Sequence, residues 1–152
     1  KYMENMFARR VRTHLLSSSG FGPDQFGYLE DHSCEDAIYS FLASAGIMEA
    51  EQQGGGLWSA CLDYETAFPA TFRAALWVKA HQKGITGRSW RYIRTLFDDS
   101  SIEVRHGELK STTTVRLERG LKEGSSLSPI LFLIFISDVI DELRTLAYCT
   151  ED

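Results

Sequence analysis

The sequence lacks any lysine or arginine between Arg12 and Arg73, and this 60-residue stretch holds nine acidic residues. The whole chain of 152 residues carries a formal net charge of −5. A polyanion would be repelled by the acidic stretch. We therefore expect weak binding of nucleic acid, with any affinity coming from two basic clusters outside the stretch. These clusters are Arg9, Arg10 and Arg12, and Arg88, Arg91 and Arg94.

The sequence also lacks an apolar run of the roughly 20 residues that span a bilayer, since its longest run is Ile130 to Ile136. No apolar segment typical of a signal peptide follows the N-terminal basic residues. The three cysteines, Cys34, Cys61 and Cys149, are too far apart for the usual spacing of metal ligands. They predict free or buried thiols in a reducing, intracellular compartment. The chain is hydrophobic enough to fold around a core.

Apolar periodicity predicts a mixture of helices and strands, which favours the α+β class. Ser33 and Asp36 have the spacing of a helix N-cap and its N3 acid. The expected helices cover, in chain order, about 3–15, 33–46, 71–83, 89–97 and 129–146. We expect a buried strand over 57–63, a hairpin around Gly107, and a small antiparallel sheet packed by helices. The helix from Pro129 has no polar face in its first turns and should be the most buried element.

Asp63 ends the expected strand, and Phe68 follows after a short turn, in the sequence "CLDYETAF". A carboxylate at a strand end is well placed to bind metal ions for phosphoryl transfer, which uses two ions about 4 Å apart. Phe68 could wall the sugar side of a nucleotide pocket. The plainer interpretation remains open: Asp63 caps a turn and Phe68 belongs to the core.

Two glycines, Gly120 and Gly124, precede the helix start at Ser128 and Pro129 in "GLKEGSSLSPILF". Glycines permit close approach of the backbone to a base or a phosphate. An ordinary loop leading into a buried helix would have the same composition.

Four ordered segments together resemble the reverse transcriptase domain of the non-LTR retrotransposon (LINE-like) type. They are "QFGYLEDHSCEDAI", "LDYETAF", "GITGRSWRYIRTLF" and "GLKEGSSLSPILF", and they extend over nearly the whole chain. The resemblance implies an incomplete right-hand polymerase in one domain over 1–152, fingers-like over 1–56 and palm-like over 57–152, without a thumb.

The resemblance also implies roles for individual residues. Asp63 would bind the catalytic Mg²⁺ ions, and Phe68 would exclude a ribose 2′-hydroxyl. The loop from Gly120 to Gly124, which includes Glu123, would contact the incoming nucleotide and the template base. The implied partner is an RNA or DNA primer–template.

The chain departs from the family pattern at several of these positions. Pro69 stands where an aspartate usually follows the aromatic residue. The fingers segment, where the family has basic residues, reads Glu30, Asp31 and His32, and Glu123 replaces a glutamine. These acids would repel a triphosphate and a primer–template, so we expect both to bind weakly. Asp63, as a single carboxylate, would hold a hydrated Mg²⁺ only loosely.

The family's third catalytic motif, Tyr-x-Asp-Asp, has no clean counterpart. "YCTED", from Tyr148 to Asp152, lies at about the expected distance, so Glu151 and Asp152 are the remaining candidates for metal ligands. An unrelated polar segment is an equally good interpretation. Three hypotheses follow: a degenerate domain without polymerase activity, the fingers and palm of an active polymerase completed by further sequence, or a protein-interaction module that reuses the fold.

Overall fold

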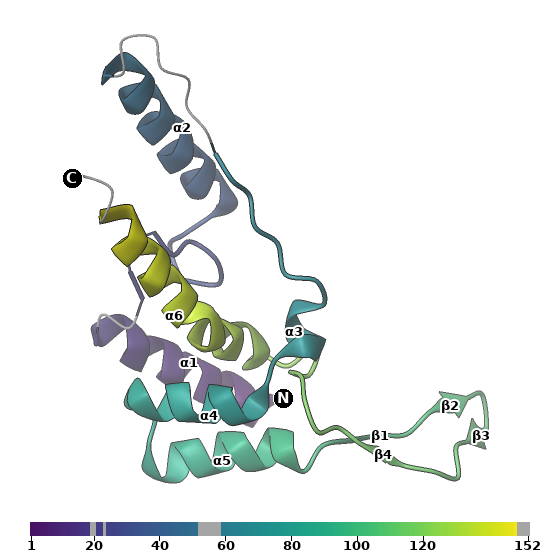
Figure 1. Ribbon diagram of the computed structural model, residues 1–152. Coiled ribbons are helices and arrows are strands. Elements are labelled where there is room, and N and C mark those ends of the chain that lie inside the picture. Colours follow the sequence, from purple (N-terminus) through teal and green to yellow (C-terminus); the bar gives the residue numbers. More distant parts are fainter. Residues whose placement is uncertain (19–20, 23, 52–58, 149–152) are drawn as a thin grey trace.

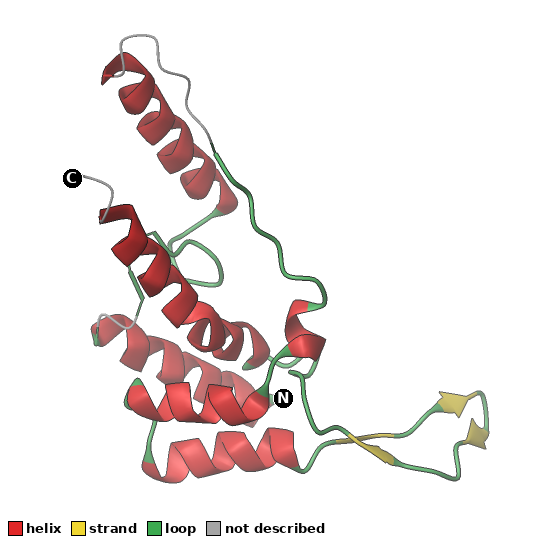
Figure 2. Cartoon of the chain, viewed as in Figure 1, coloured by secondary structure: helices red, strands yellow, loops and turns green. Residues whose placement is uncertain are grey.

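The computed structural model describes residues 1–18, 21–22, 24–51 and 59–148. Helices dominate it, and the few strands are short (Figures 1 and 2). The helices are α1 (Tyr2–Ser17), α2 (Cys34–Glu51), α3 (Ala67–Ala70), α4 (Arg73–Gln82), α5 (Gly87–Asp98) and α6 (Ser128–Tyr148). The strands are β1 (Ser101–Ile102), β2 (Arg105–His106), β3 (Leu109–Lys110) and β4 (Val115–Arg116). The described part of the chain contains no helix that is both long and apolar enough to cross a membrane.

Four helices, α1, α4, α5 and α6, enclose the hydrophobic core (Figure 1). The expected stripe on α1 is confirmed in its second half, because Val11 and Leu15 are buried while Met3 is half exposed. Phe7 of α1 stacks on Tyr92 of α5, with ring centroids 4.3 Å apart. α4 packs against α6 on one side and α5 on the other.

The first half of α6 supplies the largest share of the core, as its sequence predicts. Its residues 130–134 are all buried, and Ile130, Leu131 and Ile134 are fully so. A helix that is apolar on every side is stable only when other elements surround it. The second half of α6 is amphipathic and leaves Leu143 and Leu146 exposed.

The predicted hairpin is confirmed, but it does not form a sheet covered by helices. β1 pairs antiparallel with β4, and β2 pairs antiparallel with β3. All four strands are exposed, and the hairpin projects away from the helices (Figure 1). The small antiparallel pairing is therefore as expected, but the packing of helices against it is not found among the described residues, because each strand has only two residues and presents no apolar face to the core.

The buried strand expected over 57–63 is also not found. Residues 57 and 58 lie outside the described residues, and residues 59–63 are exposed with no regular secondary structure. A strand needs a neighbour to pair its backbone N–H and C=O groups. The described strands pair only within the hairpin, so this segment has no such partner.

α2 begins as predicted but ends later and lies apart from the core (Figure 1). Ser33 and Asp36 form the capping box: the Asp36 N–H donates to Ser33 Oγ at 3.1 Å, and the Ser33 N–H donates to Asp36 Oδ2 at 2.8 Å. The helix continues through Gly46, where we expected it to stop. Ile38, Phe41 and Leu42 are each more than half exposed, so no described element covers the apolar side of α2.

The helix expected over 71–83 is confirmed as α4, and a turn divides it from a separate short helix, α3. Pro69 lies within the short helix α3, and the chain turns at Thr71 before α4 begins at Arg73. The buried Thr71 hydroxyl donates to the Ala67 carbonyl at 2.9 Å, which fixes this turn. The division places the backbone of α3 against the loop that precedes α6.

Candidate functional site

Asp63 lies in the exposed segment that precedes α3. Its described hydrogen bond is local, because Oδ1 accepts the N–H of Tyr64 at 3.0 Å. The chain then enters α3 through Thr66, which has a left-handed backbone (φ 51°). Asp63 is therefore a solvated carboxylate held at the start of a turn, not one supported by a sheet.

Phe68 is anchored on α6 by its ring and on the glycine loop by its backbone. Its half-buried ring meets Phe132 edge to face, with centroids 5.5 Å apart. Tyr64 meets the same Phe132 ring at 5.9 Å. The Phe68 carbonyl accepts the N–H of Leu121 at 2.8 Å. The structure thus brings together Phe68 and the glycine loop, two of the features that the sequence singled out.

Gly120 is the point of closest approach between the loop and α3. Its N–H donates to the Thr71 carbonyl at 2.9 Å, and its φ is 83°. A Cβ at this position would lie 2.6 Å from the Pro69 carbonyl oxygen. Glycine is required here both by the backbone angle and by the lack of space.

The rest of the loop is open. Gly124 has a φ of 75°, but a Cβ there would meet nothing within 4 Å, and Glu123 is exposed. Ser128 Oγ donates to the Lys122 carbonyl at 2.6 Å, which ties the loop to the start of α6. The exposed edge of the loop, from Glu123 to Gly124, is the part that a ligand could reach.

Arg73 holds the loop in place, and the sequence analysis did not identify it. It is 3% exposed, at the start of α4. Its guanidinium donates to five oxygens at 2.6–3.3 Å: the carbonyls of Phe97, Leu117, Arg119 and Gly120, and Ser100 Oγ. Burial lowers the pKa of Arg73, because desolvation penalises the charged form. The signal was its position at helical spacing from Leu76, Trp77 and Ala80, all of which are buried.

The acidic turn that we expected near a triphosphate contacts other parts of the chain. Glu30 forms a 3.5 Å ion pair with Arg12 of α1. His32 Nδ1 lies 2.8 Å from the Glu30 carbonyl, and its ring meets Phe26 edge to face. Asp31 is exposed, with φ 59°. Among the described residues, none of these hydrogen bonds reaches Asp63, Phe68 or the glycine loop.

The described residues do not fit a pair of divalent ions. Nowhere in the described ranges do three or more His, Cys, Asp or Glu side chains gather as metal ligands. Glu151 and Asp152 lie outside the described residues. Asp63 is one exposed carboxylate, and it could hold a single hydrated Mg²⁺ only loosely.

Sequence comparisons give this geometry a context. The family model described as "Reverse transcriptase (RNA-dependent DNA polymerase)" matches residues 1–150. The chain is similar to the retrovirus-related Pol polyprotein from the type-1 retrotransposable element R2 of Popillia japonica, with 23% identity over 143 residues. That match covers 94% of this chain and 20% of the relative, so the chain spans about a fifth of the relative's length. No solved structure matches the chain.

Proposed function

Because the chain belongs to the reverse transcriptase (RNA-dependent DNA polymerase) family, in a form typical of non-LTR retroelements, we propose that it is a degenerate member that does not extend a primer as it stands. The observation that carries this proposal is Asp63. Two-metal phosphoryl transfer needs at least a second carboxylate beside the first. Asp63 is solvated, and its described partner is the N–H of the next residue.

The departures from the family pattern support the same proposal. Glu123 puts a negative charge on the exposed edge of the glycine loop, where the family has a neutral amide. Pro69 stands where an acid usually follows the aromatic residue, and its backbone packs against Gly120. An added acid at a triphosphate site costs affinity through like-charge repulsion.

We assign residues 1–56 to a fingers-like part and residues 57–152 to a palm-like part. The support is the contact between Phe68 and the loop at Gly120, since the resemblance places both beside one nucleotide.

A primer-extension assay tests the proposal. The chain is incubated with an RNA or DNA template, a primer and deoxynucleotides, in Mg²⁺ and separately in Mn²⁺, beside an Asp63→Ala control. We expect no extension by either protein. Extension that disappears in Asp63→Ala would mean that the site is functional.

A second assay distinguishes two causes of inactivity: repulsion by acids near the nucleotide, and the lack of a second metal-binding carboxylate. A variant that restores family-type residues at Glu30, His32, Pro69 and Glu123 should still fail to extend a primer. Supplying a Tyr-x-Asp-Asp strand in addition should be required for any activity. Extension by the restored variant without that strand would overturn the requirement for a second carboxylate.

The alternative is a fingers-and-palm portion of an active polymerase, completed by polypeptide beyond these 152 residues. The observation that favours it is the uncovered apolar side of α2, including Ile38, Phe41 and Leu42, which a further element could bury. A longer protein that carries this domain would then extend a primer, and its activity would depend on Asp63.

A further inference from the structure

The two-helix segment formed by α4 and α5 differs in charge from the rest of the chain. Between Glu65 and Asp98 the sequence contains no acidic residue, but it contains Arg73, Lys79, Lys83, Arg88, Arg91 and Arg94. Arg88, Arg91 and Arg94 are exposed on α5. A chain with a net charge of −5 therefore has a locally cationic surface.

A pocket of about 360 Å³ opens between these two helices. Its size is in the range of small-ligand sites. Trp77 and Trp90 supply its aromatic lining, and Ala74 and Val78 supply aliphatic lining. The polar lining residues are His81, Gln82 and Arg94.

The indole N–H groups of both tryptophans already have partners within the protein. Trp77 Nε1 donates to Asp98 Oδ1, and Trp90 Nε1 donates to the Trp77 carbonyl, each at 3.1 Å. The rings are therefore held in fixed positions. Trp77 is buried, so the aromatic surface that a ligand can reach is mainly that of the half-buried Trp90. Such surface favours a flat ring without selecting its hydrogen-bonding groups.

A cationic side chain lies directly over this aromatic surface. The Arg94 guanidinium carbon is 5.1 Å from the centroid of the Trp90 ring, and the His81 ring meets Trp90 edge to face at 6.2 Å. Arg94 uses Nε to donate to Asp98 Oδ2 at 2.9 Å, and its side chain is 51% exposed. Because that bond uses Nε, the two terminal nitrogens of this half-exposed side chain can contact an anion. Arg91 lies one helical turn away on α5.

This pocket is separate from the candidate polymerase site. On α4, Lys79 contacts α6 through the Phe135 carbonyl and Asp138, and Leu76 and Ala80 belong to the core. Phe68 and the glycine loop pack on that α6 side. The pocket residues Ala74, Val78 and His81 lie on a different side of α4, toward α5.

We propose that the α4–α5 pocket binds single-stranded nucleic acid, with a base against the half-buried Trp90 ring and the adjacent phosphates on Arg94 and Arg91. Aromatic surfaces combined with basic side chains are the common means of binding unpaired strands without sequence preference. The proposal does not depend on the polymerase site, because no step of it uses Asp63.

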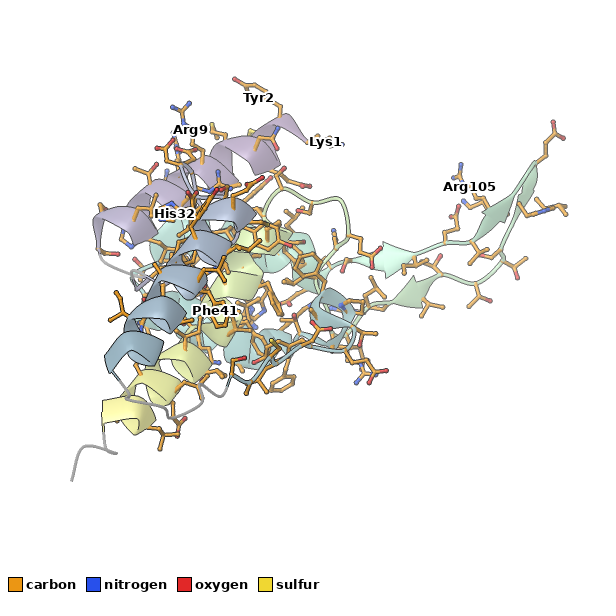
Figure 3. All side chains as sticks on the ribbon, turned by 90° about the horizontal axis from the view of Figure 1, so that it is seen from above. Lys1, Tyr2, Arg9, His32, Phe41 and Arg105 are labelled. Atoms are coloured by element: carbon orange, nitrogen blue, oxygen red, sulfur yellow. The ribbon has the colours of Figure 1, made fainter. Side chains whose placement is uncertain are left out.

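Fluorescence anisotropy with a labelled oligothymidylate tests the proposal directly. We expect binding in the micromolar range for the unmodified chain. The double variant R91Q/R94Q should bind about tenfold or more weakly, and the slope of its salt dependence should be shallower by roughly 0.7 for each phosphate that the arginines no longer neutralise. The matched control is R105Q, at the far end of the hairpin (Figure 3), and it should bind like the unmodified chain.

An abasic oligonucleotide of the same length separates stacking from charge, because it keeps the phosphates and lacks the bases. We expect it to bind about tenfold more weakly than oligothymidylate, in line with the usual contribution of one or more stacked bases. Equal binding of the two strands would overturn the role of Trp90. Loss of binding in D63A with an intact pocket would also contradict the separation of the two sites.

A photocrosslink gives a readout that does not depend on affinity. Irradiation of a complex with 5-iodouridine-containing oligonucleotide should attach the strand to Trp90, as mapped by mass spectrometry. Crosslinks confined to other elements would overturn the proposal. Competition by an acidic peptide but not by the abasic strand would assign the pocket to an acidic protein partner instead.

Discussion

At the scale of single residues, Arg73 joins segments that are far apart in sequence. Its guanidinium binds carbonyls at the end of α5, after β4 and in the glycine loop, so one side chain fixes the relative position of all three. A buried cation is tolerated here because its donors meet oxygen atoms. The interaction stabilises the loop only while all of these bonds form together.

Replacing Arg73 with methionine should destabilise the protein strongly. Methionine keeps an apolar stem but leaves several buried carbonyls without a donor, so we expect the free energy of unfolding to fall by about 3 kcal/mol or more. Chemical denaturation followed by circular dichroism measures this change. The control Arg91→Met, at an exposed site, should change stability by less than about 0.5 kcal/mol. A similar effect of the two substitutions would mean that the Arg73 bonds contribute little.

The two loop glycines allow a paired test at the same scale. Gly120→Ala adds a Cβ only 2.6 Å from the Pro69 carbonyl oxygen, at a residue with positive φ. Gly124→Ala incurs only the cost of a side chain in the left-handed backbone conformation, about 1–2 kcal/mol. We expect the Gly120 variant to lose at least about 1 kcal/mol more than the Gly124 variant, as measured by thermal unfolding, because the crowded Cβ adds to the same backbone penalty. Equal losses of stability in the two variants would show that Pro69 moves away from the new Cβ at little energetic cost.

At the scale of elements, α2 is a helix stabilised mainly by its own cap. Its apolar side is exposed, so tertiary packing contributes little to its stability. We expect the amides of α2 to exchange with solvent deuterium much faster than those of α4 and α6, because opening α2 does not disrupt the core. Mass spectrometry of peptides after exchange would measure this. Equal protection of α2 and α6 would mean that another surface covers α2.

The capping box can be tested within the same experiment. Ser33→Ala removes the hydroxyl that accepts the Asp36 N–H, and removal of a cap costs about 1 kcal/mol. The effect should appear as faster exchange in α2 with little change in the melting temperature of the whole protein. A large drop in melting temperature would contradict the independence of α2.

The contact between α4 and α6 has a predicted pH dependence. The Lys79 ammonium donates to Asp138 Oδ1 at 2.6 Å, and this hydrogen bond lowers the pKa of Asp138. A carboxyl whose pKa is lower in the folded state than in the unfolded state stabilises the fold above about pH 4, and this contribution is lost as the pH falls through the folded-state value. Because Asp138 is 60% exposed, we expect less than about 1 kcal/mol.

Asp138→Asn should therefore be slightly less stable than the unmodified protein at pH 7, and the difference should shrink toward zero in acid. Urea unfolding at pH 7 and at about pH 3 measures both values. Glu118→Gln, at an exposed site, is the control and should show no such convergence. A difference that stays constant with pH would assign the effect to packing rather than to the carboxylate charge.

At the scale of the whole molecule, the acidic stretch between Arg12 and Arg73 opposes binding of a duplex. We expect weak binding of a primer–template at physiological salt, because long-range repulsion lowers the affinity for a polyanion. A titration would contradict this if it gave submicromolar binding with a steep salt dependence. The cationic α4–α5 surface should give single strands the advantage over duplexes, since its aromatic surface needs an unpaired base.

Local sequence patterns were sufficient to locate most of the helices, the hairpin and the family. Apolar spacing located α1 and α5, and the uninterrupted apolar run at the start of α6 predicted its burial. The Ser33–Asp36 spacing located the start of α2. These features could be read from the sequence because they depend on neighbours within a few positions along the chain.

The contacts of those elements, by contrast, depended on how the whole chain folds. The strand expected before Asp63 required a partner strand, and the described residues provide none. The helical spacing of Arg73 from Leu76, Trp77 and Ala80 indicated that it is buried, but only the fold placed carbonyls from three segments around it. The meeting of Trp77, Trp90 and Arg94 in one pocket likewise required the packing of α4 on α5. Such sites join residues distant in sequence, and their positions depend on how whole elements pack against each other.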